Sequence, residues 1–222
     1  SGATFYAWGA EVSIQNTGPV LYLDWEDCIE DFRIRWAKIT GRSEDGMVYR
    51  RCFRPISDDL DYLMELVIET DPALVVIDSA GQATHGELNS PEAAMGLFRA
   101  TRMLNRTCLV IAHAPKNNPE TVFGSAYFTN LARSVWQVKC AGEPGAPEFT
   151  LGFSHSKSNV GPKQKPFAVH VQISDERVIT TPANLDMAPG LESMQGNPAR
   201  IKALLGAEGK MKASEIAEAT GI

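Results

Sequence analysis

The chain has 222 residues, which is room for one large domain or for one domain and part of a second. Hydrophobic residues make up 44% of it and charged residues 22%, and these proportions exclude a chain that is disordered throughout. The formal net charge of −6 argues against a protein that coats nucleic acid by bulk positive charge, but it is compatible with a local basic channel.

No segment approaches the roughly 20 consecutive apolar residues that a transmembrane helix needs. The N-terminus lacks the basic stretch followed by an apolar one that marks a secretory signal. The cysteines are Cys28, Cys52, Cys108 and Cys140; they form no Cys-x-x-Cys pair, and we expect reduced residues in or near the core. These features predict a cytoplasmic protein with no membrane partner.

Short apolar runs recur along the first two thirds of the chain and are predicted to be strands. Continuous apolar strands of this kind are buried on both faces, which is typical of parallel sheets. The five runs are Val20–Leu23, Met47–Phe53, Leu74–Ile77, Leu109–Ala112 and Ser134–Lys139.

The segments between the first four runs show helical spacing of apolar residues. Helices are predicted over Asp27–Thr40 and over Asp58–Glu69, with Ser57 as the candidate N-cap of the second. Ser90-Pro91-Glu92 begins a third helix, because it combines a cap, a proline at the first position and an acid in the first turn; that helix ends near Asn105. Strands that alternate with helices predict an α/β fold with a mainly parallel sheet flanked by helices.

The pattern changes after Cys140. Alternating segments separated by turns at Gly161-Pro162 and Ser174-Asp175 predict antiparallel hairpins added to one edge of the sheet. Residues 183–196 carry no periodicity and are interpreted as a linker. Two short helices are predicted after it. The strand segments are Glu148–Lys157, Phe167–Ile173 and Arg177–Thr180, and the helices are Asn197–Gly206 and Ala213–Thr220.

The first, third and fourth predicted strands end in polar groups: Asp24 to Asp27, Asp78-Ser79 and His113. Each group alone fits a helix cap or a turn equally well, but the carboxyl ends of parallel strands meet at one edge, where ligands bind. A strand Leu-Val-Val-Ile-Asp is typical of the Walker B strand, whose carboxylate holds Mg²⁺. Glu26 is placed to deprotonate an attacking water, and His113 to sense the terminal phosphate.

Motifs in the same order across residues 18–170 resemble those of RecA-like ATPases, in particular the RepA-type hexameric replicative helicases and their relatives. The resemblance covers the second strand, the Walker B strand, the sensor, the Gly-Ser…Ala-Arg-x-x-Trp stretch and the Lys-x-Asn-x-Gly-Pro hairpin of that group. In this chain they are Val20–Asp27, Leu74–Ser79, Ile111–Lys116, Phe123–Trp136 and Lys157–Pro162.

The resemblance implies ATP and Mg²⁺ as cofactors, and it implies a role for each matched residue. Glu26 corresponds to the catalytic carboxylate, and Arg35 to an arginine that contacts the nucleotide region. Asp78 corresponds to the Mg²⁺ ligand, with Ser79 beside it at the nucleotide. His113 corresponds to the γ-phosphate sensor.

The resemblance also implies a homo-oligomeric, hexameric ring in which one subunit reaches the ATP of the next. Arg133 is the first candidate for that finger and Lys157 the second. A salt bridge is the alternative role for Arg133, and a solvated hairpin position for Lys157. Some hexameric helicases carry Lys-x-Arg in this hairpin, whereas Asn159 stands at the second position here.

The chain departs from the family at its start. P-loop ATPases hold phosphates with a Gly-x-x-x-x-Gly-Lys-[Ser/Thr] loop, and this motif occurs nowhere in the sequence. Residues 1–17 are interpreted as the helix after that loop, with Ser1 either at its Ser/Thr position or part of a tag remnant. On this interpretation the chain starts just after the P-loop and binds ATP poorly by itself; the alternative is a family member that has lost the loop.

The last 26 residues resemble the beginning of a winged helix-turn-helix, because Ala-Ser-Glu-Ile-Ala followed by Thr-Gly is a common turn into a recognition helix. An ordinary helical hairpin is the alternative. The expected organisation is therefore an ATPase core over residues 1–182, a linker over 183–196 and a winged helix-turn-helix fragment over 197–222.

These interpretations favour the ATPase core of a DNA helicase or related DNA-dependent motor, with single-stranded DNA as its partner. Gly81–Asn89 and Asn117–Val122 are the candidate DNA-binding loops, since they are polar and follow the third and fourth strands. Two alternatives remain: a non-motor regulator of the KaiC-like or recombinase-mediator type, and a non-catalytic oligomerisation or DNA-binding module.

Overall fold

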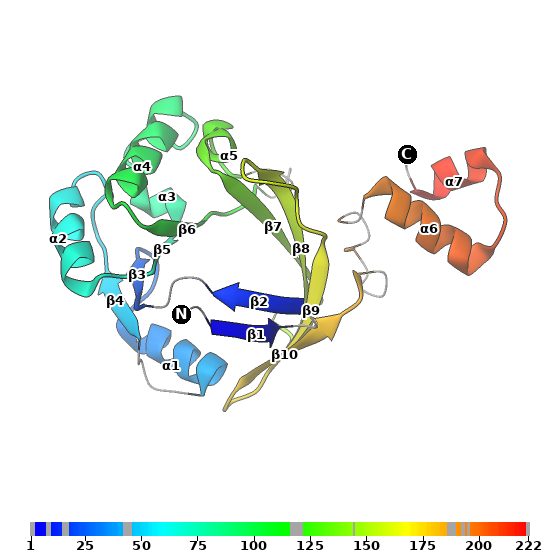
Figure 1. The fold of residues 1–222 in the computed structure, drawn as a ribbon, viewed down its shortest axis with the longest axis horizontal. Helices are drawn as coiled ribbons and strands as arrows, with labels where there is room; N and C mark the ends of the chain where they lie inside the picture. Colours follow the sequence, from blue (N-terminus) through cyan, green and yellow to red (C-terminus); the bar gives the residue numbers. More distant parts are fainter. Residues whose placement is uncertain are drawn as a thin grey trace. The chain divides into compact units, whose positions relative to one another are not determined.

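The computed structural model describes residues 3–7, 10–14, 18–41, 46–115, 122–143, 145–185, 190–191, 194 and 196–220. These residues form two compact units, Ser1–Arg133 and Ser134–Ile222 (Figure 1). No helix in the described part of the chain is long and apolar enough to cross a bilayer.

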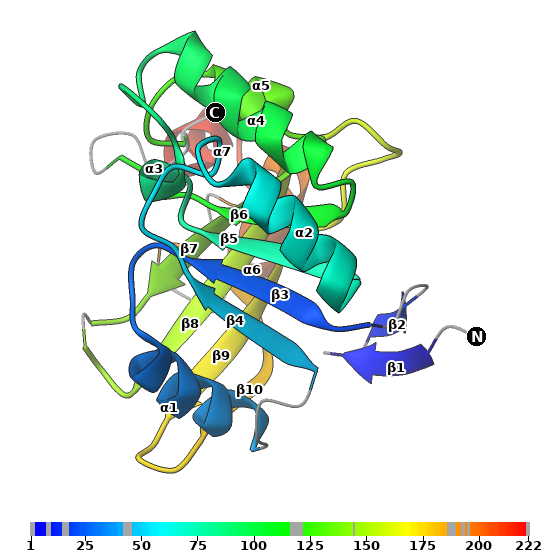
Figure 2. The same ribbon diagram turned by 90° about the vertical axis from the view of Figure 1, so that its left-hand side faces the viewer.

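A four-stranded parallel sheet forms the centre of the first unit, in the order β4-β3-β5-β6. Its helix α1 lies on one face, and α2 and α4 lie on the other (Figure 2). The predicted α/β architecture is thereby confirmed. The strands are β3 (Val20–Asp24), β4 (Met47–Arg51), β5 (Leu74–Asp78) and β6 (Thr107–Ile111), and the helices are α1 (Ile29–Thr40), α2 (Leu60–Thr70), α3 (Ala80–Ala83), α4 (Pro91–Met103) and α5 (Tyr127–Leu131).

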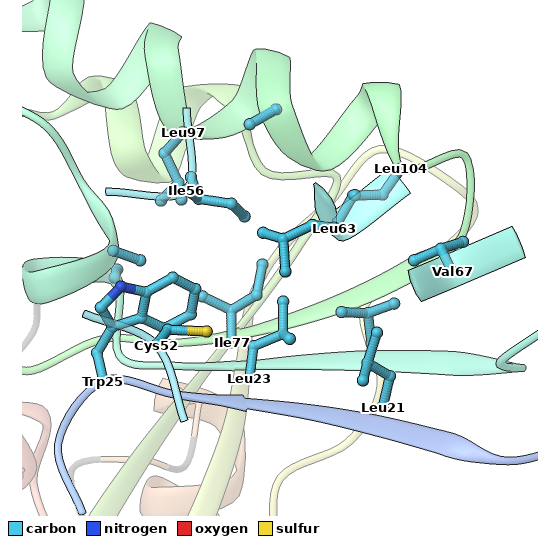
Figure 3. Packing of buried hydrophobic residues seen from close by; sticks show 14 of the residues in the cluster. Leu21, Leu23, Trp25, Cys52, Ile56, Leu63, Val67, Ile77, Leu97 and Leu104 are labelled. Atoms are coloured by element: carbon cyan, nitrogen blue, oxygen red, sulfur yellow. The ribbon is translucent and has the colours of Figure 1, made fainter. Parts of the chain in front are cut away.

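The main core lies between the sheet and the helices α2 and α4 (Figure 3). Leu21 and Leu23 of β3 point to this face because alternate residues of a strand share a face. They pack with Ile77 of β5, Leu63 of α2 and Leu97 of α4, all of which are almost completely buried.

The opposite face of β3 and β4 carries aromatic side chains that pack against α1. The ring of Phe32 lies 4.9 Å from that of Tyr22 and 4.7 Å from that of Tyr49, measured between centroids. Trp36 follows one helical turn later and stacks on Phe32 at 6.1 Å. This aromatic layer fixes α1 against the sheet.

The N-cap residue predicted from the sequence is confirmed for α4 and is wrong for α2. Ser90 caps α4, since its hydroxyl accepts a hydrogen bond from the backbone N–H of Ala93. The helix α2 starts at Leu60, with Asp59 at the N-cap position. Ser57 was the predicted cap, but it lies in the preceding turn and donates to Asp58, which removes it from the end of the helix.

The strand β6 differs from the prediction that the apolar strands are buried on both faces. Its side chains alternate, so that Leu109 and Ile111 are 52% and 38% exposed while Cys108 and Val110 pack on the core. Among the described strands β6 pairs only with β5, and it therefore forms an edge of the parallel sheet.

The N-terminal residues contradict the predicted helix over 1–17. The backbone forms an antiparallel hairpin of β1 (Ala3–Ala7) and β2 (Ala10–Ile14), with Ala7 opposite Ala10. The segment is rich in aromatic and β-branched residues, and these favour strands over helices. Ser1 lies outside the described residues.

The second unit contains an antiparallel sheet in the order β10-β9-β8-β7. The predicted antiparallel strands are confirmed, and they form a sheet of their own. Ser134–Lys139 was predicted as a fifth apolar strand of the parallel type, but it belongs to β7 here, whose alternating burial is the pattern of an antiparallel strand. The strands are β7 (Ser134–Ala141), β8 (Glu148–Ser158), β9 (Phe167–Ile173) and β10 (Val178–Ala183).

A small core covers one face of this antiparallel sheet. Leu185, Leu191 and Met194 pack with Ala168 of β9. A side chain at Gly152 would lie 2.7 Å from the sulfur of Met194, so the glycine lets this segment approach β8. The described part of the predicted linker therefore contributes buried side chains.

Two helices end the chain, α6 (Asn197–Glu208) and α7 (Ala213–Thr220), as predicted. The carboxylate of Glu215 accepts a hydrogen bond from the backbone N–H of Lys212 and so caps the first turn of α7. Their assignment to a winged helix-turn-helix stays a prediction.

All four cysteines are free thiols, as expected for reduced residues. Two of them lie in apolar surroundings, where burial raises the pKa of Cys52 and of Cys108 to about 11. The expectation of a near-core position is wrong for Cys28 and Cys140, which are exposed. Cys28 stands before α1, and Cys140 lies on the exposed side of β7.

Candidate active site

Glu26, Ser79 and His113 come together at the carboxyl edge of the parallel sheet, from the ends of β3, β5 and β6. The Ser79 hydroxyl donates a short hydrogen bond to Oε1 of Glu26. The Nε2 atom of His113 lies 3.2 Å from the same oxygen. Both described contacts fall on Oε1, so Oε2 has no partner among the described residues.

The hydrogen bond from Ser79 lowers the pKa of the Glu26 carboxyl below its ordinary value. His113 acts in the same direction, while partial burial opposes both. The Glu26 side chain is 33% exposed. Glu26 is therefore an ionised carboxylate at neutral pH that water can reach, which is the state a general base needs.

The buried carboxylate of Asp24 fixes the backbone that carries Glu26. Its Oδ1 accepts hydrogen bonds from the N–H groups of Glu26 at 2.8 Å and Asp27 at 2.9 Å. The Tyr49 hydroxyl donates to Oδ2 at 3.1 Å, and a guanidinium nitrogen of Arg51 lies 3.5 Å from Oδ1. Asp24 is 1% exposed, so these contacts compensate a carboxylate removed from water.

Trp25 joins the ends of β3 and β5. Its backbone N–H donates to the carbonyl of Asp78 at 2.7 Å, and its indole N–H donates to the carbonyl of Arg54 at 2.8 Å. The ring itself belongs to the main core. Glu26 thus follows two anchored residues, Asp24 and Trp25, and its own backbone N–H is held by the Asp24 carboxylate.

Asp78 lies at the end of β5, directly opposite Asp24 in the sheet register. The Tyr22 hydroxyl donates to its Oδ2 at 2.5 Å. Burial, and then this hydrogen bond, raise the pKa of Tyr22, which keeps the phenol protonated and acting as a donor. The peptide bond between Asp78 and Ser79 is cis.

The chemistry of Asp78 and Ser79 fits Mg²⁺. A carboxylate and a hydroxyl are oxygen ligands, which this hard cation prefers, and Mg²⁺ usually takes only one or two carboxylates and keeps several waters. Among the described residues Tyr22 is the one partner of the Asp78 carboxylate, and it engages a single oxygen. The other oxygen is available for a cation.

Other predicted residues lie elsewhere. Arg35 of α1 forms an ion pair with Asp27, which lies just before this helix. Arg35 takes no part in the contacts of Glu26. Arg133 is exposed at a bend directly before β7, and Lys157 lies on β8 in the second unit. The described partners of the Glu26 side chain are Ser79 and His113 alone.

The two candidate DNA-binding loops differ in what the structure describes. Of Asn117–Val122 only Val122 lies within the described residues. Gly81–Asn89 is held partly in place, because the carbonyl of Leu88 accepts a hydrogen bond from Ser125 at 2.8 Å and the Leu88 side chain packs on the core.

Sequence reasoning missed the tyrosines that support the site. Tyr22 and Tyr49 are neighbours in the register of β3 and β4, and each donates to an aspartate at a strand end. The available signal was the spacing Tyr22-x-Asp24, because residues two apart on a strand share a face. That spacing does not reveal which neighbouring strand supplies the partner.

Comparisons with known proteins bear on the fold. No family model and no curated protein matches the sequence. Among solved structures, a KaiC-like protein from the hyperthermophilic archaeon Pyrococcus horikoshii is similar, with a TM-score of 0.56 and 15% sequence identity. The match covers 74% of this chain and 76% of that one. Together with the parallel sheet, its flanking helices and the antiparallel sheet, this similarity shows that the chain has a RecA-like α/β fold.

Proposed function

We propose that this chain carries the hydrolytic centre of a RecA-like ATPase, and that the whole protein works as a DNA helicase or a related DNA-dependent motor. The observation that carries the proposal is the ionised Glu26, held by Ser79 and His113 where three parallel strands end. Catalysis of phosphoryl transfer depends mainly on positioning and charge, and this arrangement supplies both.

Each residue has a defined part in the proposed reaction. Glu26 accepts a proton from the water that attacks the γ-phosphate in line with the departing ADP. Asp78 and Ser79 would hold Mg²⁺, which neutralises charge on the phosphate oxygens when it is bound. His113 contacts both Glu26 and solvent, so it can pass the state of the terminal phosphate to the base.

Arg133 is proposed to complete the site of a neighbouring subunit in a hexameric ring. A trans arginine stabilises charge on the transferred phosphoryl group, an effect of roughly 10³-fold or more in related enzymes. Arg133 is exposed and stands directly before β7, so it is accessible to a second copy. Lys157 is the second candidate.

The similarity to a KaiC-like protein supports a second candidate function, a non-motor regulator that hydrolyses ATP without moving along DNA. The two functions differ in their response to DNA. A motor is expected to hydrolyse ATP faster when single-stranded DNA is present and to separate a duplex, whereas DNA-independent turnover without strand separation would favour the regulator.

The test uses the protein supplied with a phosphate-binding loop, because hydrolysis also needs this loop and the sequence does not contain its motif. Glu26→Gln should lower the rate of ATP hydrolysis by at least about 100-fold, the usual contribution of a general base, while nucleotide affinity changes little. Glu65→Gln is the matched control, an exposed acid on α2, and should keep full activity. Undiminished hydrolysis by Glu26→Gln would exclude the proposed base.

The proposed role of Arg133 at a neighbouring subunit is tested by mixing subunits that carry different substitutions. Arg133→Ala should abolish turnover and leave nucleotide binding intact. Mixed with Glu26→Gln subunits, it should regain part of the activity, because some interfaces then pair an intact Glu26 with an intact Arg133. A mixture that forms rings and stays inactive would favour Lys157 instead.

A further inference from the structure

We propose that the second unit binds single-stranded nucleic acid on a surface that combines stacked rings with lysines. The rings and lysines, which we call the stacking surface, are Trp136, Phe153, His155, Phe167, Lys163 and Lys165. The choice of ligand rests on the proposed DNA-dependent function; the site is distinct from the hydrolytic centre and from the loops that sequence analysis considered.

The rings form a continuous row across three strands. Trp136 of β7 stands opposite His155 of β8, and their rings are parallel within 2° at a centroid distance of 4.5 Å. Phe167 of β9 meets Trp136 edge-on at 5.9 Å and stacks on Phe153 at 4.8 Å. A row of this kind presents flat apolar surface at a low cost in side-chain entropy.

Hydrogen bonds on both sides of its ring hold His155 in place. Its Nδ1 accepts from the backbone N–H of Gln164 at 3.0 Å, so the ring proton belongs to Nε2, which lies 2.9 Å from the hydroxyl of Ser134. These two contacts fix the imidazole against rotation. It is a pre-organised partner for Trp136.

The same hydrogen bond ties the β8–β9 connection to the rings. Gln164 is the residue between Lys163 and Lys165, so the backbone of both lysines lies beside the aromatic row. Both lysines are exposed. Two exposed positive charges are thereby placed next to the apolar row of rings.

The charge of this region is opposite to that of the protein. Residues 149–174 contain three lysines and not one aspartate or glutamate, whereas the whole chain carries −6. A polyanion is thus attracted to this surface and repelled by most of the rest. The phosphates of a nucleic acid meet this charge, and its bases meet the rings.

Trp136 is 39% exposed, and Val138 lies beside it on the same side of β7 at 55% exposure. Bases stack on exposed aromatic rings without sequence preference, since every base has a π-face. A duplex keeps its bases stacked inside, so only a single strand can use both features of the surface. This is why we assign a single strand and not a duplex.

The test measures binding of a labelled oligothymidine of 20 nucleotides to the full-length protein by fluorescence anisotropy, without ATP. Trp136→Leu should weaken binding on the order of tenfold, because one stacked base is lost. Trp136→Phe keeps an aromatic face and should recover most of that loss. Tryptophan fluorescence of the wild-type protein should also fall when the oligonucleotide binds, and it should fall less in Trp136→Phe, which keeps the other three tryptophans.

The contribution of Lys163 and Lys165 is tested by the salt dependence of oligonucleotide binding. The double variant Lys163→Ala/Lys165→Ala should reduce the slope of log affinity against log salt by about 1.4, since each phosphate contact of a single strand contributes roughly 0.7. Arg99→Ala/Arg102→Ala removes the same charge from the exposed side of α4 and should leave the slope near that of the wild type. Because all four side chains are exposed, both double variants should fold normally.

Two results would overturn the proposal: unchanged binding by both Trp136→Leu and the Lys163/Lys165 variant, or binding of a blunt duplex as tightly as the single strand. A folding defect in Trp136→Leu leaves the lysine variant and Trp136→Phe to decide. Glu26→Gln should bind the oligonucleotide normally, so failure of the hydrolytic proposal and failure of this one are seen in different measurements.

Discussion

The phenol of Tyr22 donates a hydrogen bond of 2.5 Å to Asp78, the aspartate that ends the neighbouring strand. The same relationship recurs one strand away, where Tyr49 donates to Asp24 at 3.1 Å. Both tyrosine rings pack with Phe32 of α1. The aromatic layer between α1 and the sheet therefore sets the positions of both acidic strand ends.

Removing the Tyr22 hydroxyl tests this relationship. Tyr22→Phe keeps the ring in its packing and should lower the free energy of unfolding by about 1 kcal/mol, because Asp78 loses a donor but can regain water. Urea denaturation measures the change. Tyr62→Phe is the control. Tyr62 is exposed on α2, so the loss of its hydroxyl should change the free energy of unfolding little. Equal stabilities for the two variants would mean that the hydrogen bond contributes nothing measurable.

Asp24 is predicted to matter more for stability than any exposed acid of the first unit. Asp24→Ala leaves the N–H groups of Glu26 and Asp27 and the hydroxyl of Tyr49 without their acceptor, and a loss of about 2–3 kcal/mol is expected. Asp61→Ala, on the exposed side of α2, is the control and should change the stability by less than about 0.5 kcal/mol. A loss no larger than that of the control would contradict the anchoring role.

The pH dependence of hydrolysis tests the hydrogen bond from Ser79 to Glu26. The Glu26 pKa is depressed in the folded protein, so the carboxylate is ionised at neutral pH and becomes protonated only as the pH falls through the lowered pKa. Ser79→Ala removes the main cause of the depression. The acidic limb of the pH–rate profile of the proposed ATP hydrolysis should therefore move to higher pH.

The control for this shift is Ser57→Ala, whose hydroxyl donates to Asp58 in the turn before α2. Its acidic limb should coincide with that of the wild type. If Ser79→Ala lowers the rate equally at every pH, Ser79 acts on the nucleotide or metal and not through the ionisation of Glu26.

The packing of the second unit is tested at Gly152. A Cβ atom there would lie 2.7 Å from the sulfur of Met194 and 3.1 Å from methyl groups of Leu191. Gly152→Val should therefore cost about 1–3 kcal/mol through overpacking. Gly206→Ala in α6 meets nothing within 4 Å and should instead be neutral or stabilising. Thermal unfolding of the two variants distinguishes these outcomes.

The sequence predicted the four strands of the parallel sheet, the helices α1, α2 and α4, and the convergence of the strand ends that carry Glu26, Asp78 and His113 at one edge. Both successes depend on local information. Apolar runs and a capping signal such as Ser90-Pro91 act within a few residues, and the carboxyl ends of parallel strands lie at one edge whatever the strand order is.

The local signals were insufficient for the first residues of the chain, for β6 and for β7. A short apolar run does not state which sheet it joins, so Ser134–Lys139 was compatible with a parallel strand until its antiparallel pairing with β8 was known. Likewise the exposure of Leu109 and Ile111 follows from the edge position of β6, which only the strand order gives.

The sequence by itself determined that two carboxylates and a histidine, Glu26, Asp78 and His113, follow three strands of an α/β fold. Only the tertiary structure decided what supports them: Tyr22 for Asp78, and Tyr49 with Arg51 for Asp24. The physical reason is that a side-chain hydrogen bond between strands depends on register and on the face of the sheet. Here it joins Tyr22 to a partner 56 positions along the chain, a separation that no local pattern encodes.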